Sequence, residues 1–239
     1  MKDINVFGTI GTCWYDEDSV SAADFAKQLK EADGEDVCVH INSGGGNVFD
    51  ANTMAETLRA YKGRTTASIE GLAASAASYF ALTADEVVIG PSALFMVHNP
   101  YTYASGEAKD MRKAADLLDK LRGTISDQYV KKTGMDKDEV EALMDEETWF
   151  TAEEAVERGF ADRMSDAEPV AACVSPECLK GFRNAPDGLD AAAGDARRTI
   201  RSEDDTEPSP GAGEGGAGAA PRTVCVNGAF LKLGGGIER

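Results

Sequence analysis

Hydrophobic and polar positions along the first 165 residues follow strand and helix patterns that alternate. Residues 36–42 are apolar at successive positions, which is typical of a strand covered on both faces. Further strands are expected at residues 4–7, 65–70, 86–89 and 93–97, and helices at residues 21–32, 50–61, 75–82, 107–133, 136–145 and 151–159. This order predicts an α/β layer with a mostly parallel sheet and right-handed crossovers.

The long helical pattern over residues 107–133 carries a heptad-like seam, with positions at alternating steps of four and three. The seam contains Met111, Ala114, Leu118, Leu121, Ile125 and Gln128. Such a seam packs either on its own domain or against a second subunit. The pattern alone favours packing on its own domain, and both interpretations stay open.

Composition changes after residue 165. Residues 166–239 hold 12 of the 25 glycines, six of the eight prolines and only two of the 17 aromatic residues. Such a segment buries too little apolar area to offset the conformational entropy lost on ordering. We therefore expect a folded domain over residues 1–165 and a disordered acidic tail over residues 166–239. Its apolar end, residues 223–233, suits either a docking peptide or a frayed terminus, and the frayed terminus is the simpler expectation.

The chain carries 42 acidic and 24 basic side chains, a formal net charge of −18. This argues against nucleic acid as a partner, because phosphate recognition needs a basic face. No run approaches the roughly 20 apolar residues of a membrane span, and no signal-peptide pattern opens the chain. A cytoplasmic protein is expected. The five cysteines lack partners at zinc-ligand spacing, so we expect reduced thiols and no metal. The glycines after residue 42 form neither a dinucleotide fingerprint nor a P-loop, so no cofactor is expected.

Two glycine-rich stretches, residues 42–46 and 71–75, follow strands that should end at the same edge of the sheet. Sites in parallel sheets form at the carboxyl ends of strands. Ser75 stands where the second stretch meets a helix, and the N–H groups of a helix start favour an oxyanion nearby. Serine is also a common N-cap, and by itself the position favours that simpler role.

A serine nucleophile needs a base, and the chain has only two histidines. His40 lies within the strand over residues 36–42 and is expected to be a core residue with its polar atoms satisfied. His98 directly follows the strand over residues 93–97 and precedes Pro100, so its imidazole can emerge at the strand's end. His98 is the better base. The sequence offers 42 carboxylates and does not single out a third member of a triad.

Four stretches follow one another along the chain: NSGGG (residues 42–46), GLAAS (71–75), MVHNP (96–100) and WFTAEEAVERGFAD (149–162). In this order they resemble the ClpP-type serine peptidases, and more closely the phage-encoded ClpP-like head maturation proteases. Gly44 stands where the family's first motif has proline, and the similarity runs over about residues 4–165. The resemblance implies a ClpP/crotonase-like fold.

The resemblance implies roles for individual residues. Ser75 corresponds to the nucleophile and His98 to the general base. The backbone N–H groups of Gly46 and Ala76 correspond to the oxyanion hole. Acyl transfer would then proceed through a covalent acyl-enzyme that water hydrolyses.

The resemblance also concerns the triad acid and the oligomer. Glu147 stands where the family has an aspartate, and Asp145 is the alternative. Residues 107–133 match the helix through which the family's subunits and rings pack, which shifts the expectation for the seam toward a ring-like homo-oligomer. The N-terminus is too short for the axial loop of housekeeping ClpP, so docking to an ATP-driven unfoldase is doubtful.

The expected function is that of an ATP-independent serine endopeptidase acting on protein or peptide substrates, with phage scaffold and capsid proteins as candidates. Three alternatives remain. A crotonase-like acyl-CoA enzyme would not need Ser75, and the sequence shows no basic cluster for its phosphates. A related type of peptidase uses a lysine as its base, for which Lys131 or Lys132 could serve. His98 disfavours this alternative, because it lies in the segment that matches the family's base. A non-catalytic assembly protein would use the acidic tail as an interaction arm.

Overall fold

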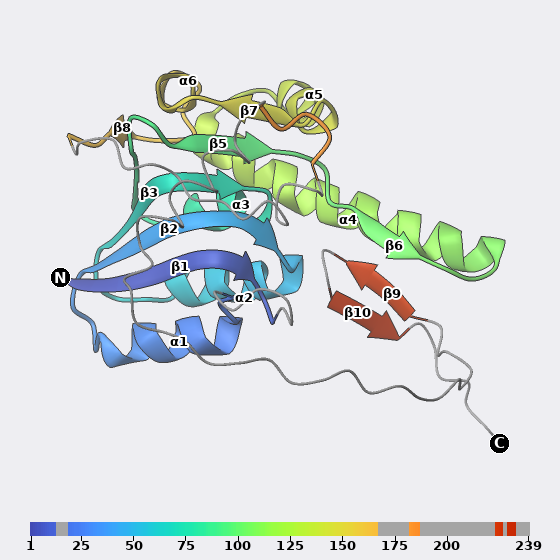
Figure 1. Cartoon of the computed structure of the whole chain (residues 1–239), viewed down its shortest axis with the longest axis horizontal. Coiled ribbons are helices and arrows are strands. Elements are labelled where there is room, and N and C mark those ends of the chain that lie inside the picture. Colours follow the sequence, from blue (N-terminus) through green and yellow to red (C-terminus); the bar gives the residue numbers. More distant parts are fainter. Residues whose placement is uncertain (13–18, 167–181, 187–222, 227–228, 233–239) are drawn as a thin grey trace, which may run out of the picture.

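A computed structural model of the chain describes residues 1–12, 19–166 and 182–186, and the backbone of residues 223–226 and 229–232. Seven strands of this described part form one sheet (Figure 1). They run in the order β1-β2-β3-β4-β8, and β5 pairs with both β3 and β7. Every pair is parallel except β5 with β7. The strands are β1 (Lys2–Ile10), β2 (Val37–Gly46), β3 (Thr65–Ala74), β4 (Glu86–Ile89), β5 (Leu94–Val97), β7 (Thr148–Phe150) and β8 (Arg163–Met164).

Several helices begin or end at capping residues. Ser21 accepts a hydrogen bond from the Asp24 backbone N–H, and Thr151 forms a capping box with Glu154. Gly134 ends the long helix in the left-handed conformation. The helices are α1 (Ala22–Glu31), α2 (Val48–Arg59), α3 (Ala76–Ala81), α4 (Ala108–Thr133), α5 (Lys137–Asp145) and α6 (Ala152–Glu157).

The main core lies between the sheet and helices α1, α2 and α3. Phe25 of α1 meets Phe80 of α3 edge to face, with ring centroids 5.2 Å apart, an arrangement that aromatic pairs favour. A second aromatic group joins β5 and β7 to the segment after α6. The ring centroids of Phe95 and Phe150 each lie 5.1 Å from the ring centroid of Phe160. The strand pairing and this packing together confirm the α/β layer with a mostly parallel sheet.

The carboxyl ends of β1, β2, β3 and β5 lie at one edge of the sheet, and α4 extends beyond that edge (Figure 1). The second half of α4 packs on its own domain, where Leu121, Ile125 and Tyr129 are buried. In the first half, Ala114 is buried as well, whereas Met111 is 37% exposed. Packing on its own domain is therefore correct for most of the seam, and Met111 is left at the surface.

Several boundaries differ from the sequence expectation. The glycine-rich stretches are not turns, because pairing continues through them: Ile10 pairs with Gly46, and Ser43 pairs with Ala73. Register shifts between Phe7 and Thr9 and between Ile41 and Ser43 accommodate the glycines. The short strands β6 (Thr102–Ala104), β7 and β8 were not predicted, because two or three residues carry no periodic signal.

The end of the chain also differs from the expected frayed terminus. The backbone of residues 223–226 and 229–232 forms an antiparallel pair, β9 (Thr223–Val226) with β10 (Ala229–Lys232), and β9 pairs with β6. The exposed edge of β6 offers the hydrogen-bonding groups that such a pair needs. Most of the expected disordered tail lies outside the described residues, so the division at residue 165 stays a prediction.

Candidate active site

Ser75 stands at a sharp turn between the end of β3 and the start of α3. Its backbone has φ 55° and ψ −123°, which a residue with a side chain rarely adopts and which costs on the order of 1–3 kcal/mol. Its side chain makes no N-cap hydrogen bond, so the ordinary capping role is wrong. The turn instead presents the hydroxyl at the carboxyl edge of the sheet, as a nucleophile on a strand-to-helix turn requires.

His98 directly follows β5 and meets this hydroxyl. The His98 Nε2 atom lies 2.6 Å from Ser75 Oγ, and the histidine is only 7% exposed. Burial lowers the pKa of His98 to about 4; the Glu147 carboxylate opposes this shift and Arg183 adds to it. His98 is therefore neutral at pH 7, the state in which Nε2 can accept a proton from the serine.

A buried hydrogen-bond network stabilises the strained turn at Ser75. The Ser78 hydroxyl donates to the Ser75 backbone carbonyl at 2.7 Å and lies 2.8 Å from the Tyr129 hydroxyl. Burial raises the pKa of Tyr129, so the phenol is neutral and can donate. Through Tyr129 and Ser78, helix α4 is connected by hydrogen bonds to the backbone of the candidate nucleophile. No local sequence pattern predicts this connection.

Glu147 is buried close to the second nitrogen of the histidine. Its Oε2 atom lies 3.9 Å from His98 Nδ1, a distance that suits charge interaction but is too long for a hydrogen bond. The backbone at Glu147 has φ 52°. Asp145, the alternative acid, is engaged elsewhere, because its Oδ1 atom accepts hydrogen bonds from Asn99 at 2.6 Å and Arg122 at 3.0 Å. Between these two carboxylates, the geometry favours Glu147.

Gly45 and Gly46 are both closely packed, but only Gly45 is packed against the serine. A Cβ atom added at Gly45 would lie 2.8 Å from Ser75 Cβ and 2.9 Å from the Ala76 backbone N, so only glycine fits there. At Gly46 the added atom would meet Ile10 backbone O at 2.2 Å. Sequence reasoning overlooked Gly45, although it lies in the same motif. The oxyanion role of Gly46 and Ala76 stays a prediction.

His40 does not lie in the core as expected. Its side chain is 25% exposed on the face of β2 that points away from the main core, and it contacts carboxylates on both sides: Glu70 at Nδ1, and Asp3 at Nε2 at 3.2 Å. The alternation of a strand places Cys38 on the same face. Among the described residues, Asp3, Cys38 and His40 have ligand atoms within 4.8 Å of one another and are the candidate metal ligands.

A short segment from the C-terminal part of the chain lies beside the candidate triad. Residues 182–186, drawn in orange, pass close to β7 (Figure 1). The Phe182 ring makes edge contacts with His98 and with Trp149, at centroid distances of 5.6 and 5.4 Å. The expectation of disorder over residues 166–239 missed this contact, because the average composition of a long segment does not show the effect of one aromatic residue.

Comparison with known proteins identifies the family. A sequence model of the Clp protease family matches residues 17–168. The chain belongs to the Clp protease family. A point mutant of ClpP1 from Listeria monocytogenes is similar in structure, with a TM-score of 0.61, 21% sequence identity, and coverage of 70% of this chain and 92% of that one.

Membership of the Clp protease family sets the class of the protein. The family consists of serine-type peptidases that act on protein substrates, and its members form ring-like homo-oligomers. The structural likeness agrees with the ClpP-like α/β fold expected from the sequence. In the part of the chain that the structure describes, no helix has the length and apolar character of a membrane span.

Proposed function

We propose that this chain is an ATP-independent ClpP-type serine endopeptidase in which Ser75 is the nucleophile, His98 the general base and Glu147 the triad acid. The observation that carries the proposal is the 2.6 Å contact between His98 Nε2 and Ser75 Oγ at the strained end of β3. A hydroxyl that meets a neutral imidazole at this distance can lose its proton as it attacks a carbonyl carbon.

The reaction would follow from these positions. His98 Nε2 takes the Ser75 proton, Ser75 Oγ attacks the peptide carbonyl, and the imidazolium returns the proton to the leaving amine. The backbone N–H groups of Gly46 and Ala76 would stabilise the oxyanion, helped by the start of α3. Water, activated by the same imidazole, then hydrolyses the acyl-enzyme.

For the substrate we propose phage scaffold and capsid proteins, processed during head maturation by a ring-like homo-oligomer. This rests on the similarity of the four sequence stretches to the phage ClpP-like proteases. An extended substrate can bind beside residues 42–46 as an added strand, which gives broad specificity. The chain's own residues 190–222 are a further candidate substrate, and a constant intact mass on prolonged incubation would argue against self-cleavage.

The deciding experiment is intact-mass measurement after treatment with a fluorophosphonate. We expect one adduct in the native chain, none in Ser75→Ala and none in His98→Ala. Ser68→Ala, which removes a hydroxyl elsewhere on β3, is the matched control and should keep the adduct. An adduct that survives in Ser75→Ala would refute the assignment, and a chain that never reacts would favour a non-catalytic assembly protein.

A further inference from the structure

The first inference rests on the proposed function and concerns the segment Phe182–Pro186, here called the docked segment. It makes four hydrogen bonds to the loop that carries Glu147. Two come from its side chains, because Arg183 donates to the Asp145 backbone carbonyl at 3.1 Å and Asn184 donates to the Glu146 carbonyl at 2.6 Å. The segment is thus fixed to the loop between α5 and β7.

The other two hydrogen bonds occupy the carboxylate itself. The Arg183 backbone N–H donates to Glu147 Oε2 at 2.9 Å, and the Asn184 backbone N–H donates to Oε1 at 2.7 Å. The same Oε2 atom is the one that lies 3.9 Å from His98 Nδ1. Hydrogen bonds to charged groups are among the stronger ones in proteins, so these amides hold the carboxylate at a distance from the imidazole, together with the Trp149 indole N–H that donates to Oε1 at 3.4 Å.

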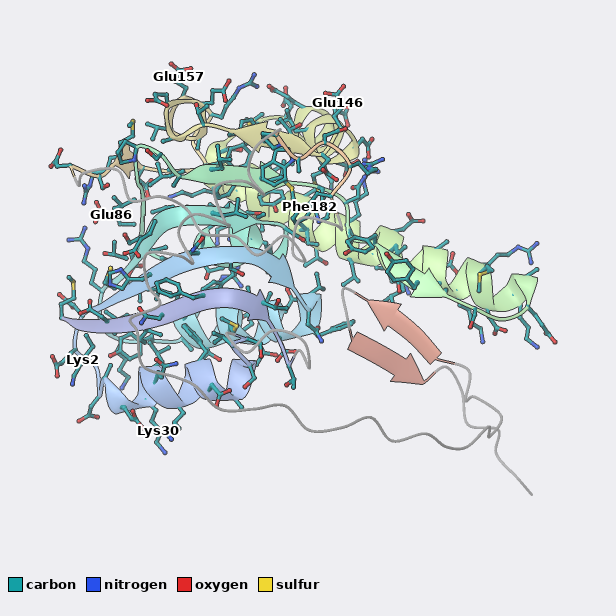
Figure 2. The ribbon with its side chains drawn as sticks, in the orientation of Figure 1. Lys2, Lys30, Glu86, Glu146, Glu157 and Phe182 are labelled. Atoms are coloured by element: carbon teal, nitrogen blue, oxygen red, sulfur yellow. The ribbon has the colours of Figure 1, made fainter. Side chains whose placement is uncertain are left out.

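Phe182, the aromatic residue of the docked segment, covers the ring of His98. Phe182 packs between His98 and Trp149 and against a small apolar cluster made by Leu72, Ala74 and Met96. Figure 2 shows Phe182 near the edge of the sheet from which α4 extends. That is the edge at which Ser75 meets His98, and a peptide must approach there to react.

We infer that the docked segment is an internal ligand of the catalytic site, which occludes His98 and holds Glu147 away from it, so that substrate and segment compete. The surface fits a peptide that bends after an aromatic side chain and then presents two free backbone N–H groups. Departure of the segment would expose the imidazole and let the Glu147 carboxylate turn toward Nδ1.

The test compares the rates at which a p-nitrophenyl ester acylates Ser75 in the full chain. A segment that occupies the site nine-tenths of the time slows acylation about tenfold, so Phe182→Ala should react about ten times faster than the native chain. Asn184→Pro, which removes the N–H bonded to Oε1, should also react faster. Arg158→Ala, which removes an exposed arginine paired with Glu139, is the control and should not change the rate.

A synthetic peptide of residues 181–187 gives the complementary measurement. Added to the Phe182→Ala chain, it should slow acylation in a concentration-dependent manner, whereas the same peptide with alanine for phenylalanine should not. Equal or slower acylation in Phe182→Ala would overturn the inference, because a supporting role for the segment predicts a loss of rate. Absence of any Ser75 adduct in every chain would instead overturn the proposed function.

A second inference rests on a different cluster, on the face of the sheet that carries His40. Asp3 of β1 pairs in register with Cys38 of β2, and His40 lies two residues further on the same face. His40 Nε2 is 3.2 Å from Asp3 Oδ1, close to the edge of a tetrahedron around zinc, whose bonds to nitrogen and oxygen are about 2.0–2.2 Å. Cys38 is a free, buried thiol.

The remaining nitrogen of the same imidazole supports this arrangement. Glu70 of β3 contacts His40 Nδ1, which matches the carboxylate–histidine–metal pattern of zinc sites, where a carboxylate orients the ligand. We propose that exposed Asp3, half-buried His40 and buried Cys38 form a site for a zinc-like divalent cation at the edge of the surface, with solvent completing the shell. The cation would balance a face that gathers two carboxylates and a thiol.

Zinc titration of the full chain against a chromophoric chelator tests the second inference, with Co²⁺ as a spectroscopic probe. We expect one ion per chain and a sulfur-to-cobalt charge-transfer band, both lost in Cys38→Ala. Glu70→Gln should weaken binding about tenfold or more. Cys178→Ala controls for the other thiols and should bind normally. Binding that is unchanged in Cys38→Ala, or that lacks the sulfur band, would overturn the site.

Discussion

The low pKa of His98 makes two linked predictions about pH. A histidine with an ordinary pKa of 6.5 that is lowered to about 4 by burial stays neutral in the folded chain over this interval, while the unfolded chain takes up a proton. The unfolded state therefore binds more protons between pH 6.5 and about 4, and the free energy of unfolding falls as the pH is lowered through this range. A shift of this size corresponds to roughly 3 kcal/mol.

The assay separates this effect from the protonation of the many carboxylates. Urea unfolding at pH values from 7 down to 4 is measured on the native chain and on His98→Asn, which lacks the titrating group. The native chain should lose roughly 3 kcal/mol more than the variant over the interval. In parallel, acylation of Ser75 should stay constant down to about pH 5 and decline below it.

Either of two results would refute this reasoning. If both chains lose stability in parallel, His98 is not neutral and buried in the folded state. If acylation declines with a midpoint near 6.5, the pKa of His98 is not lowered. A midpoint that moves upward in Arg183→Ala would agree with the direction in which Arg183 acts on His98.

Three further predictions concern the surroundings of the serine. Tyr129→Phe removes one buried hydrogen bond and should lower the unfolding free energy by about 1–2 kcal/mol, measured in urea, with slower acylation. Gly45→Ala should abolish acylation, because its Cβ atom would lie 2.7 Å from a backbone oxygen, whereas Gly34→Ala has a similar positive φ and open space and should keep it. Glu147→Gln should slow acylation more than Asp145→Asn, and the reverse order of rates would transfer the acid role.

The order of the longer elements and the location of the candidate pair, Ser75 and His98, could be predicted from the amino-acid sequence. Strand periodicity placed β2 to β5, and the small number of histidines reduced the choice of base to His40 or His98. The motif order around Ser75 indicated the family before any geometry was known. These features are local, because they depend on spacing along the chain and on the chemistry of single residues.

Which distant residues meet depends on the three-dimensional packing. The choice between Glu147 and Asp145 depends on the positions of Asn99 and Arg122, which no spacing rule connects to them. The support of the nucleophile turn by Tyr129 depends on how α4 packs against α3.

The docked segment and the His40 cluster arise in the same way. Glu147 and Arg183 are 36 positions apart in the chain, and His40 on β2 contacts Glu70 on the neighbouring strand β3. Composition predicted disorder for the first region, and the position of His40 within a strand predicted a core residue with satisfied polar atoms. The disorder and the core position were wrong for these residues, whereas both ring nitrogens of His40 do have partners. Hydrogen bonding and charge between distant segments outweighed the local pattern.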